Sequence, residues 1–177
     1  MLTRATVVVT LAALMSFTAA LAAPPSDTDR RHLENLAREA DSAWDVGDAA
    51  TLSGLYTTDA TLVMAPREPV DGREAIRVYF EQSFAKRPAN LRHVTAVRRI
   101  EMLAPDVAFV DTDVRLERRA DDGSWPVVRR FANYTVAIRD GEGWRVKEVR
   151  THVKQDPAAA AGTPAPAPSP AGSTAAR

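Results

Sequence analysis

Four long segments rich in β-branched and aromatic residues follow one another from residue 91 to residue 154, and this pattern limits the fold more than any other feature of the chain. The segments cover about 91–103, 106–119, 127–139 and 144–154. Short connections that contain Pro, Asp or Gly separate them, which is typical of antiparallel hairpins. The chain is therefore expected to place four long strands side by side in one sheet.

Helices are expected before these strands. Ser26 and Asp29 have the composition of a helix start, and Gly47 that of a helix end, so the sequence predicts a helix over 28–46. Its apolar residues recur at helical spacing: Leu33, Leu36, Ala37, Ala40 and Trp44. Asp48 is expected to cap a second, very short helix that carries Leu52 and Leu55.

A strand, "ATLVMAP", is predicted next, followed by a helix that Asp71 caps and Glu74 supports by reaching back. Ile76, Phe80 and Phe84 would line one face of this helix. The order of elements predicts an α+β fold in which a curved antiparallel sheet, covered by N-terminal helices, encloses a cone. The tight corner before "ATLVMAP" is expected to turn Trp44, Tyr56 and Met64 into that cone.

The two ends of the chain differ in composition from the domain at 24–156. Residues 1–23 combine Arg4 with a mostly apolar run and a small-residue end, which predicts a secretory signal peptide and a periplasmic or secreted protein. The alternative is an uncleaved membrane anchor. Residues 157–177 are rich in Ala and Pro and predict a disordered tail. Because the chain has no cysteine, a lipid-anchored lipoprotein, a disulfide and a thiolate metal site are excluded.

Charge and motif content exclude several classes of partner. The chain has 23 basic and 23 acidic residues, and this balance argues against a nucleic-acid partner. His32, His93 and His152 are far apart and lack the spacing of metal ligands, so no metal site is expected. No glycine-rich dinucleotide motif is present, and no cofactor is expected. We interpret His93, which opens a strand beside Arg92, as structural or exposed rather than catalytic.

The stretches "WDVGDAATLSGLYTTDATLVMAP", "VDGREAIRVYFEQSF", "APDVAFVDTDVRL" and "GWRVKEVRTHV" together resemble the nuclear transport factor 2-like superfamily. The nearest branch is the SnoaL-like group of small exported bacterial proteins, which is related to ketosteroid isomerases and polyketide cyclases. The resemblance covers residues 28–153 and implies a cone-shaped α+β barrel, commonly a homodimer, with a pocket between sheet and helices. Since relatives with this fold have many activities or none assigned, the resemblance does not determine a function.

The resemblance also indicates that two isomerase groups are absent. The carboxylate base of the isomerases matches Met64 or Ala65, which cannot accept a proton, and their helix tyrosine matches Ala40. Their second acid matches Tyr134, which as a buried tyrosine would donate a hydrogen bond or simply belong to the core.

The last strand has the richest chemistry in the sequence. By the two-residue period of a strand, one face carries Trp144, Val146, Glu148, Arg150 and His152. If this face looks into the cone, as the resemblance implies, Glu148, Arg150 and His152 form a polar row at its wall and His152 is a candidate acid–base group. The alternative is an ion-paired row on a solvated strand end.

A second polar row on 106–119 consists of Asp111, Asp113, Arg115 and Glu117, and the opposite side carries Ala108, Val110, Val114 and Leu116. We expect the apolar residues to face inward and the charges to face water. In the reverse arrangement, the charges would line the pocket mouth and the apolar residues would pack against a dimer partner.

Three functions remain open. The first is an exported SnoaL-like domain, homodimeric through its sheet, that binds a small, moderately apolar molecule without stable membrane association. The second is a cofactor-independent acid–base enzyme of the isomerase, cyclase or dehydratase type that uses His152 with Glu148 or Tyr134. The third is a structural or interaction module whose cone is filled by its own side chains. The candidate ligand contacts are Trp44, Tyr56, Met64, Phe80, Tyr134, Arg150 and His152.

Overall fold

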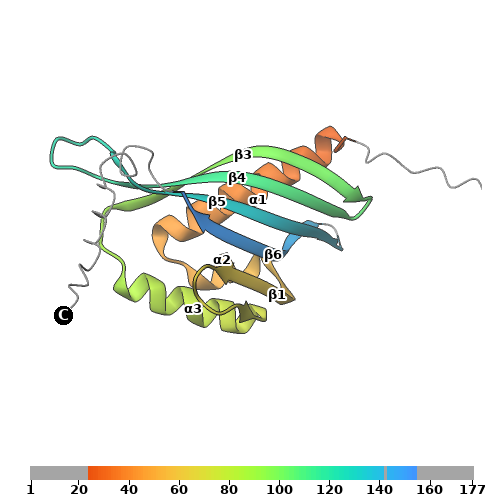
Figure 1. Cartoon of the computed structure of the whole chain (residues 1–177), viewed down its shortest axis with the longest axis horizontal. Coiled ribbons are helices and arrows are strands. Elements are labelled where there is room, and N and C mark those ends of the chain that lie inside the picture. The colour runs from red at the N-terminus through yellow and green to blue at the C-terminus, as the bar shows by residue number, and fades with distance from the viewer. Residues whose placement is uncertain (1–23, 142, 155–177) are drawn as a thin grey trace, which may run out of the picture.

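A curved sheet of six strands with three helices on one face forms the domain (Figure 1). The structure is a computed structural model, and it describes residues 24–141 and 143–154. The strand order is β2-β1-β6-β5-β4-β3. Helix α1 lies along the inner face of the long strands, and α3 lies beside β1. The expected α+β architecture, a curved sheet covered by N-terminal helices, is confirmed.

Helix α1 (Asp27–Val46) begins and ends where its capping residues predict. The Ser26 hydroxyl accepts a hydrogen bond from the Asp29 amide, and Asp27 and Asp29 place negative charge in the first turn. Gly47 has φ 75°, a left-handed conformation that ends the helix and that residues with a Cβ rarely adopt. Asp48 caps the short helix α2 (Ala49–Gly54) by accepting from the Thr51 amide. The corner after α1 is therefore encoded by local sequence.

Strand β1 (Tyr56–Met64) pairs with the two-residue strand β2 (Val70–Asp71), and helix α3 (Arg73–Lys86) follows. The predicted capping of α3 is wrong, because its N-cap is Gly72 and no side chain caps it. Asp71 instead accepts a hydrogen bond from Thr61 across the β1–β2 pair, at 2.6 Å. Glu74 binds Arg77 one turn along the helix. Pairing within the sheet therefore takes precedence over helix capping at Asp71.

The long strands are β3 (Leu91–Ala104), β4 (Val107–Arg118), β5 (Val127–Asp140) and β6 (Gly143–Val153). They pair antiparallel in sequence order, as the turns predict. The β4–β5 hairpin extends beyond the rest of the sheet (Figure 1). The last strand, β6, lies between β5 and β1 and runs parallel to β1. Through this insertion, the end of the domain joins its first strand to the meander.

Two clusters of buried side chains hold the helices to the sheet. In the first, Leu33 of α1 packs on Val110, Ala137 and Trp144 of the sheet. In the second, Ile76 of α3 packs with Leu62 and other residues of β1 and β6. Leu33 and Ile76 are almost fully buried, which makes each an anchor of its helix. Burial of this kind stabilises such a side chain by about 1.5–3 kcal/mol.

The signal peptide predicted at residues 1–23 and the tail predicted at 157–177 lie outside the described residues. Within the part of the chain that the structure describes, no helix combines the length and apolarity needed to cross a membrane.

Candidate functional site

A small cavity lies between α1 and the inner face of the sheet, and its volume is about 100 Å³. Helix α1 contributes only apolar side chains to its wall, including Leu36, Ala37 and Ala40. The polar groups of the wall come from strands β1, β3, β4 and β5: Tyr56, His93, Thr95, Thr112, Asn133 and Thr135. The cavity thus has an apolar helical side and a polar sheet side.

His93 and Asp41 form a pair at the edge of this cavity. His93 is on the inner face of β3, and its Nδ1 lies 2.6 Å from Oδ1 of Asp41 on α1. Both side chains are about four-fifths buried. The Trp44 ring packs on the imidazole with 5.2 Å between ring centroids. Since Asp41 occupies Nδ1, Nε2 is the nitrogen of His93 left for other chemistry.

Asp41 is fixed by further hydrogen bonds from β3. The Thr95 amide and hydroxyl donate to its carboxylate at 2.8 and 2.6 Å. One turn later on α1, Asp45 accepts from the backbone amide of His93 at 2.6 Å. Two acids one turn apart therefore fasten the start of β3 to α1, and they hold the His93 ring in one orientation.

Asn133 and Tyr56 add polar groups to the cavity wall. The Oδ1 atom of Asn133 is buried without a hydrogen-bond partner among the described residues. A buried amide oxygen left without a partner costs free energy, which a bound donor would recover. Burial raises the pKa of the Tyr56 hydroxyl, so this group remains protonated and is a hydrogen-bond donor at neutral pH. The cavity can therefore both donate to and accept from a small polar molecule.

A row of aromatic rings, two of them from helix α3 itself, lies between this cavity and the backbone of α3. Phe80 of α3 contacts Tyr56 with centroids 6.3 Å apart, and Phe84 contacts Trp44 with centroids 6.0 Å apart. Arg87 lies over both Trp44 and Phe84 and donates to the carbonyl of Asp45 at 2.8 Å. Trp44, Phe84, Phe80 and Tyr56 thus form one chain of ring contacts, but of the predicted Trp44, Tyr56 and Phe80 only Tyr56 lines the cavity. Whether they contact a ligand stays a prediction.

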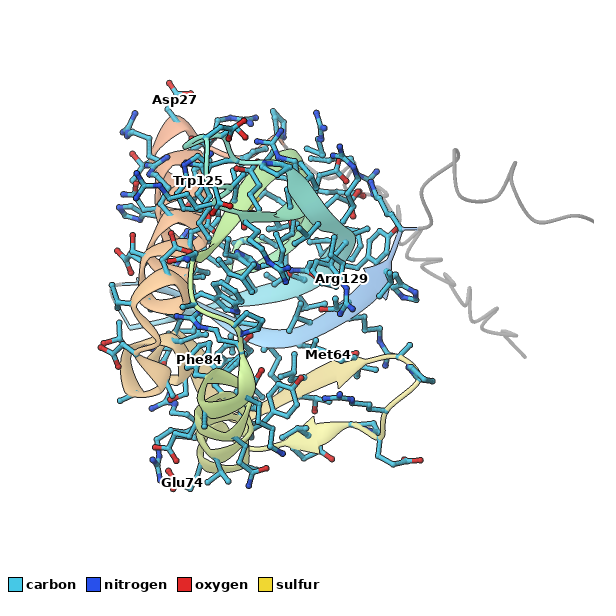
Figure 2. All side chains as sticks on the ribbon, turned by 90° about the vertical axis from the view of Figure 1, so that its left-hand side faces the viewer. Asp27, Met64, Glu74, Phe84, Trp125 and Arg129 are labelled. Atoms are coloured by element: carbon cyan, nitrogen blue, oxygen red, sulfur yellow. The ribbon has the colours of Figure 1, made fainter. Side chains whose placement is uncertain are left out.

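Met64 does not line the cavity. Its sulfur accepts a hydrogen bond from the Tyr79 hydroxyl at 2.9 Å, and it faces a groove between β1 and α3. Figure 2 shows Met64 on β1 and Phe84 on α3.

The prediction that Glu148, Arg150 and His152 share a face with Trp144 is wrong, and a β-bulge is the reason. Val146 pairs with Ala137 while Glu148 pairs with the preceding residue, Val136, so that Lys147 is an extra residue in β6. Before the extra residue the even-numbered side chains face inward, and after it the odd-numbered side chains do. Trp144 and Val146 face inward, Val149 also faces inward, and the polar row faces out. Glu148 and Arg150 form an ion pair at 2.6 Å on this outer face.

Tyr134 also lies on the outer face, where its side chain is 42% exposed. It pairs across the sheet with Asp111 and Arg150, stacks on Phe109 and contacts the His152 ring edge-on at 5.5 Å. The predicted placement of Tyr134 and His152 in the cone is therefore wrong. Tyr134 was placed there by its match to the second acid of the isomerases, whereas the β5 residues that face the cavity are its neighbours Asn133 and Thr135.

The inward arrangement predicted for β4 is confirmed. Ala108, Val110 and Val114 are buried on the inner face, and Asp111 and Asp113 lie on the outer face. Glu117 is the exception to the expectation that the charges face water. It is only 5% exposed and accepts from Arg92 at 2.7 Å, with Arg115 on its other oxygen.

Five polar residues at or beside the cavity are missing from the sequence-based candidates: Asp41, Thr95, Thr112, Asn133 and Thr135. Asp41 has a usable signal, because it lies four residues after Ala37 and three before Trp44. A carboxylate within an apolar helical stripe needs a buried partner. His93, interpreted from the sequence as structural or exposed, is mostly buried at the cavity. Within residues 24–141 and 143–154, no cluster of His, Asp and Glu is suited to hold a metal ion.

Comparison with known proteins agrees with this architecture. The family described as SnoaL-like domain matches residues 26–150. No curated protein matches the chain. A Nostoc punctiforme domain of unknown function with a cystatin-like fold is similar, with a TM-score of 0.67, 15% identity, and coverage of 77% of this chain and 83% of that one.

Two further solved structures show the same fold. An NTF2-like protein with a cystatin-like fold from Novosphingobium aromaticivorans has a TM-score of 0.64 and 23% identity, over 76% of this chain and 88% of that one. A ketosteroid isomerase-like protein from Erwinia carotovora atroseptica has a TM-score of 0.60 and 14% identity, over 74% of this chain and all of the other, 100%. At these identities the likeness concerns the fold.

Proposed function

Because this chain belongs to the SnoaL-like domain family, we propose that it binds a small molecule in the cone and transfers a proton on it with His93 and Asp41. The reaction is a cofactor-independent isomerisation, cyclisation or dehydration. This proposal assigns the acid–base role to His93 in place of His152, which lies on the outer face.

The contact between His93 and Asp41 carries the proposal. With the proton on Nδ1 and the Asp41 carboxylate accepting it, Nε2 of the neutral imidazole has a lone pair that can take a proton from a substrate. Asp41 then stabilises the imidazolium that forms. The hydrogen bonds from Thr95 hold Asp41 in place during this change. General acid–base catalysis of this kind contributes about 10²–10⁴-fold to a rate.

The other polar groups of the cavity suit the same chemistry. Tyr56, whose pKa is raised by burial, can donate to an oxygen that gains negative charge as the proton leaves. Asn133 Oδ1 can accept from a hydroxyl of the substrate. We therefore expect a substrate with a carbonyl and a hydroxyl close to the acidic carbon–hydrogen bond.

Solvent deuterium exchange tests this proposal on substrates of that chemical class. A panel of small α-hydroxyketones is incubated with the protein in D₂O, and proton NMR follows exchange at the α-carbon. We expect exchange above the buffer rate that falls about 100-fold or more in His93→Asn. The matched control, His152→Asn, should exchange as the wild type does. Equal exchange in the wild type and His93→Asn would remove His93 from the mechanism.

The size of the cavity favours a second candidate, a structural or interaction module with a filled cone. The volume of the cavity is about 100 Å³. Ligand sites usually measure about 300–1,000 Å³. Ala40→Leu, which fills the cavity from α1, separates the candidates. In an enzyme it abolishes exchange, whereas in a filled module it raises the melting temperature and changes nothing else.

We also propose that the chain is exported and forms a homodimer through the outer face of its sheet. The apolar run at 1–23 supports export, and mass spectrometry of the mature protein would show whether these residues are removed. Tyr134 and Phe109 give the outer face an aromatic centre, which supports a dimer. Analytical ultracentrifugation should then find a dimer for the wild type and a monomer for Tyr134→Asp.

A further inference from the structure

A second depression, larger than the cavity of the cone, lies between helix α3 and the β1–β2 pair, and its volume is about 560 Å³. It shares no lining residue with the cavity at His93. Phe80 and Phe84 of α3 face the aromatic row, whereas Tyr79 and Ser83 face this groove. Figure 2 shows α3 and the β1–β2 pair beside each other, with Met64 on the strand. The groove is thus a separate site of the size that small-molecule ligands occupy.

The floor of the groove is apolar and held in place. Leu62, Met64 and Val70 belong to the buried cluster under α3 or pack against it. The Tyr79 hydroxyl donates to the Met64 sulfur at 2.9 Å, which fixes the ring against the strand. An alkyl chain or an aromatic ring on this floor would bury apolar surface at about 25 cal/mol per Å².

The rim of the groove carries more positive than negative charge. Arg67, Lys86 and Arg87 line it together with one acid, Glu68. Within the described residues, none of these three cations forms an ion pair with a carboxylate, whereas most arginines of the long strands do. The guanidinium of Arg67 donates to the Tyr79 hydroxyl, at a long 3.4 Å. The rim therefore offers cationic donors to an anion from solution.

Arg87 differs from the other two because its position is fixed. Its guanidinium lies 4.4 Å from the centre of the Trp44 ring and donates to main-chain carbonyls at the end of α1. Burial lowers the pKa of Arg87, because its charge is partly removed from water and the carboxylate of Asp45 opposes this effect only in part. An anion close to Arg87 would compensate this desolvation.

We propose that this groove binds an apolar molecule that carries a carboxylate, with the apolar part on the Leu62–Met64–Val70 floor and the carboxylate between Arg67 and Lys86. A charged hydrogen bond to a guanidinium or ammonium group is the strong contact that a carboxylate makes in proteins. The site does not include His93, so an experiment on the groove can refute this proposal without refuting the proton-transfer proposal.

Octanoate and octan-1-ol test the proposal, because they share an alkyl chain and differ in charge. Isothermal titration of the full chain should give octanoate an affinity about tenfold higher than that of octan-1-ol, about 1.4 kcal/mol. The double variant Arg67→Gln/Lys86→Gln should remove this preference and leave binding of octan-1-ol unchanged. Both side chains are exposed, so the variant is expected to fold.

Three further variants locate the site. Glu68→Gln, the charge-matched control on the same rim, should bind octanoate as well as the wild type or better. Ser83→Trp places a bulky ring in the groove from an exposed position of α3 and should block both ligands. His93→Asn should change neither affinity.

Three results would overturn the proposal. The first is that octanoate does not bind at millimolar concentration. The second is that both ligands bind equally well or that the preference survives in Arg67→Gln/Lys86→Gln. The third is that binding survives in Ser83→Trp, which would place it elsewhere on the protein.

Discussion

The two faces of the sheet differ in how many charged residues they carry and in how these are paired. On the outer face, charges are numerous and paired with one another, as Arg98 and Lys154 are with Asp113. On the inner face, polar groups are few, and Asn133 is left with an oxygen that has no partner among the described residues, beside the His93–Asp41 pair. The richness of a strand in charged residues is thus a poor guide to a site. Since Asp111 on the outer face also has a buried oxygen without a partner among the described residues, the better guide is a side chain held in one orientation at a cavity, as His93 is by Asp41.

The bulge at Lys147 decides which residues of β6 face inward, so a charge placed on the inward side should have the largest effect. Val149 is 6% exposed and belongs to the buried cluster under α3. A buried charge without a partner costs several kcal/mol, and we expect Val149→Glu to lose cooperative unfolding in urea, followed by circular dichroism.

Lys147→Ala is the control in the same strand, because it keeps the bulge and loses only the contacts of the Lys147 ammonium group with Asp59. Its stability should lie within about 1 kcal/mol of the wild type. A Val149→Glu variant as stable as Lys147→Ala would show that Val149 does not face inward.

A leucine on the inner side of the sheet and a leucine on its outer face should differ strongly in their contribution to stability. Leu33, on the inner side, is 2% exposed and Leu103 on β3 is 56% exposed. Leu33→Ala should lower the free energy of unfolding by about 2–5 kcal/mol, because it leaves a cavity in the core. Leu103→Ala should change it by less than about 0.5 kcal/mol. Urea titrations of both variants measure the difference, and similar values would contradict the assignment of the core.

Asp29 makes the inner face sensitive to acid. Its pKa is lowered by the hydrogen bond from Ser26 and by hydrogen bonds from Arg139 and Trp144. A carboxyl group with a lower pKa in the folded state contributes stability above its unfolded pKa, and this contribution is lost as the pH falls through the folded pKa. Asp29→Asn should therefore be less stable than the wild type at pH 7, by about 1–2 kcal/mol.

The difference between Asp29→Asn and the wild type should shrink as the pH falls below about 4, the region in which unfolded aspartate titrates. Urea unfolding at several pH values would show this convergence. A difference that is constant from neutral to strongly acidic pH would mean that the charge of Asp29 is not involved.

The smallest effect is expected on the outer face. Arg98→Ala removes a cation that is 64% exposed and leaves Asp113 with Lys154. The change in stability should be below about 1 kcal/mol and should become smaller still at high salt, which screens exposed pairs. A larger loss would mean that the outer charges are part of a rigid network.

The fold could be predicted from the sequence because its signals are local. The caps at Ser26 and Asp48, the left-handed Gly47 and the turns between the long strands each fix an element without reference to distant residues. The helix start predicted at Asp71 is wrong where a distant strand competes, since Thr61 binds the carboxylate that was expected to cap α3.

Most of the candidate site could not be predicted from the sequence, because it depends on two non-local features. The bulge at Lys147 breaks the two-residue period, so counting along β6 from Trp144 leads to the wrong face for His152. The contact between Asp41 and His93 joins residues 52 positions apart, and nothing in either neighbourhood indicates the other as its partner. Phe80, by contrast, was placed in the interior by helix periodicity, and Tyr56 by the tight corner before the first strand.

Because β6 lies between β5 and β1, the sheet can close only after β6 has been synthesised. While this last strand of the domain is still missing, β1 has only the two-residue β2 beside it, and the open edge of β5 has no neighbour. Translation must therefore pass β6 before the domain can fold, and until that moment the strand edges of the nascent chain are exposed to aggregation.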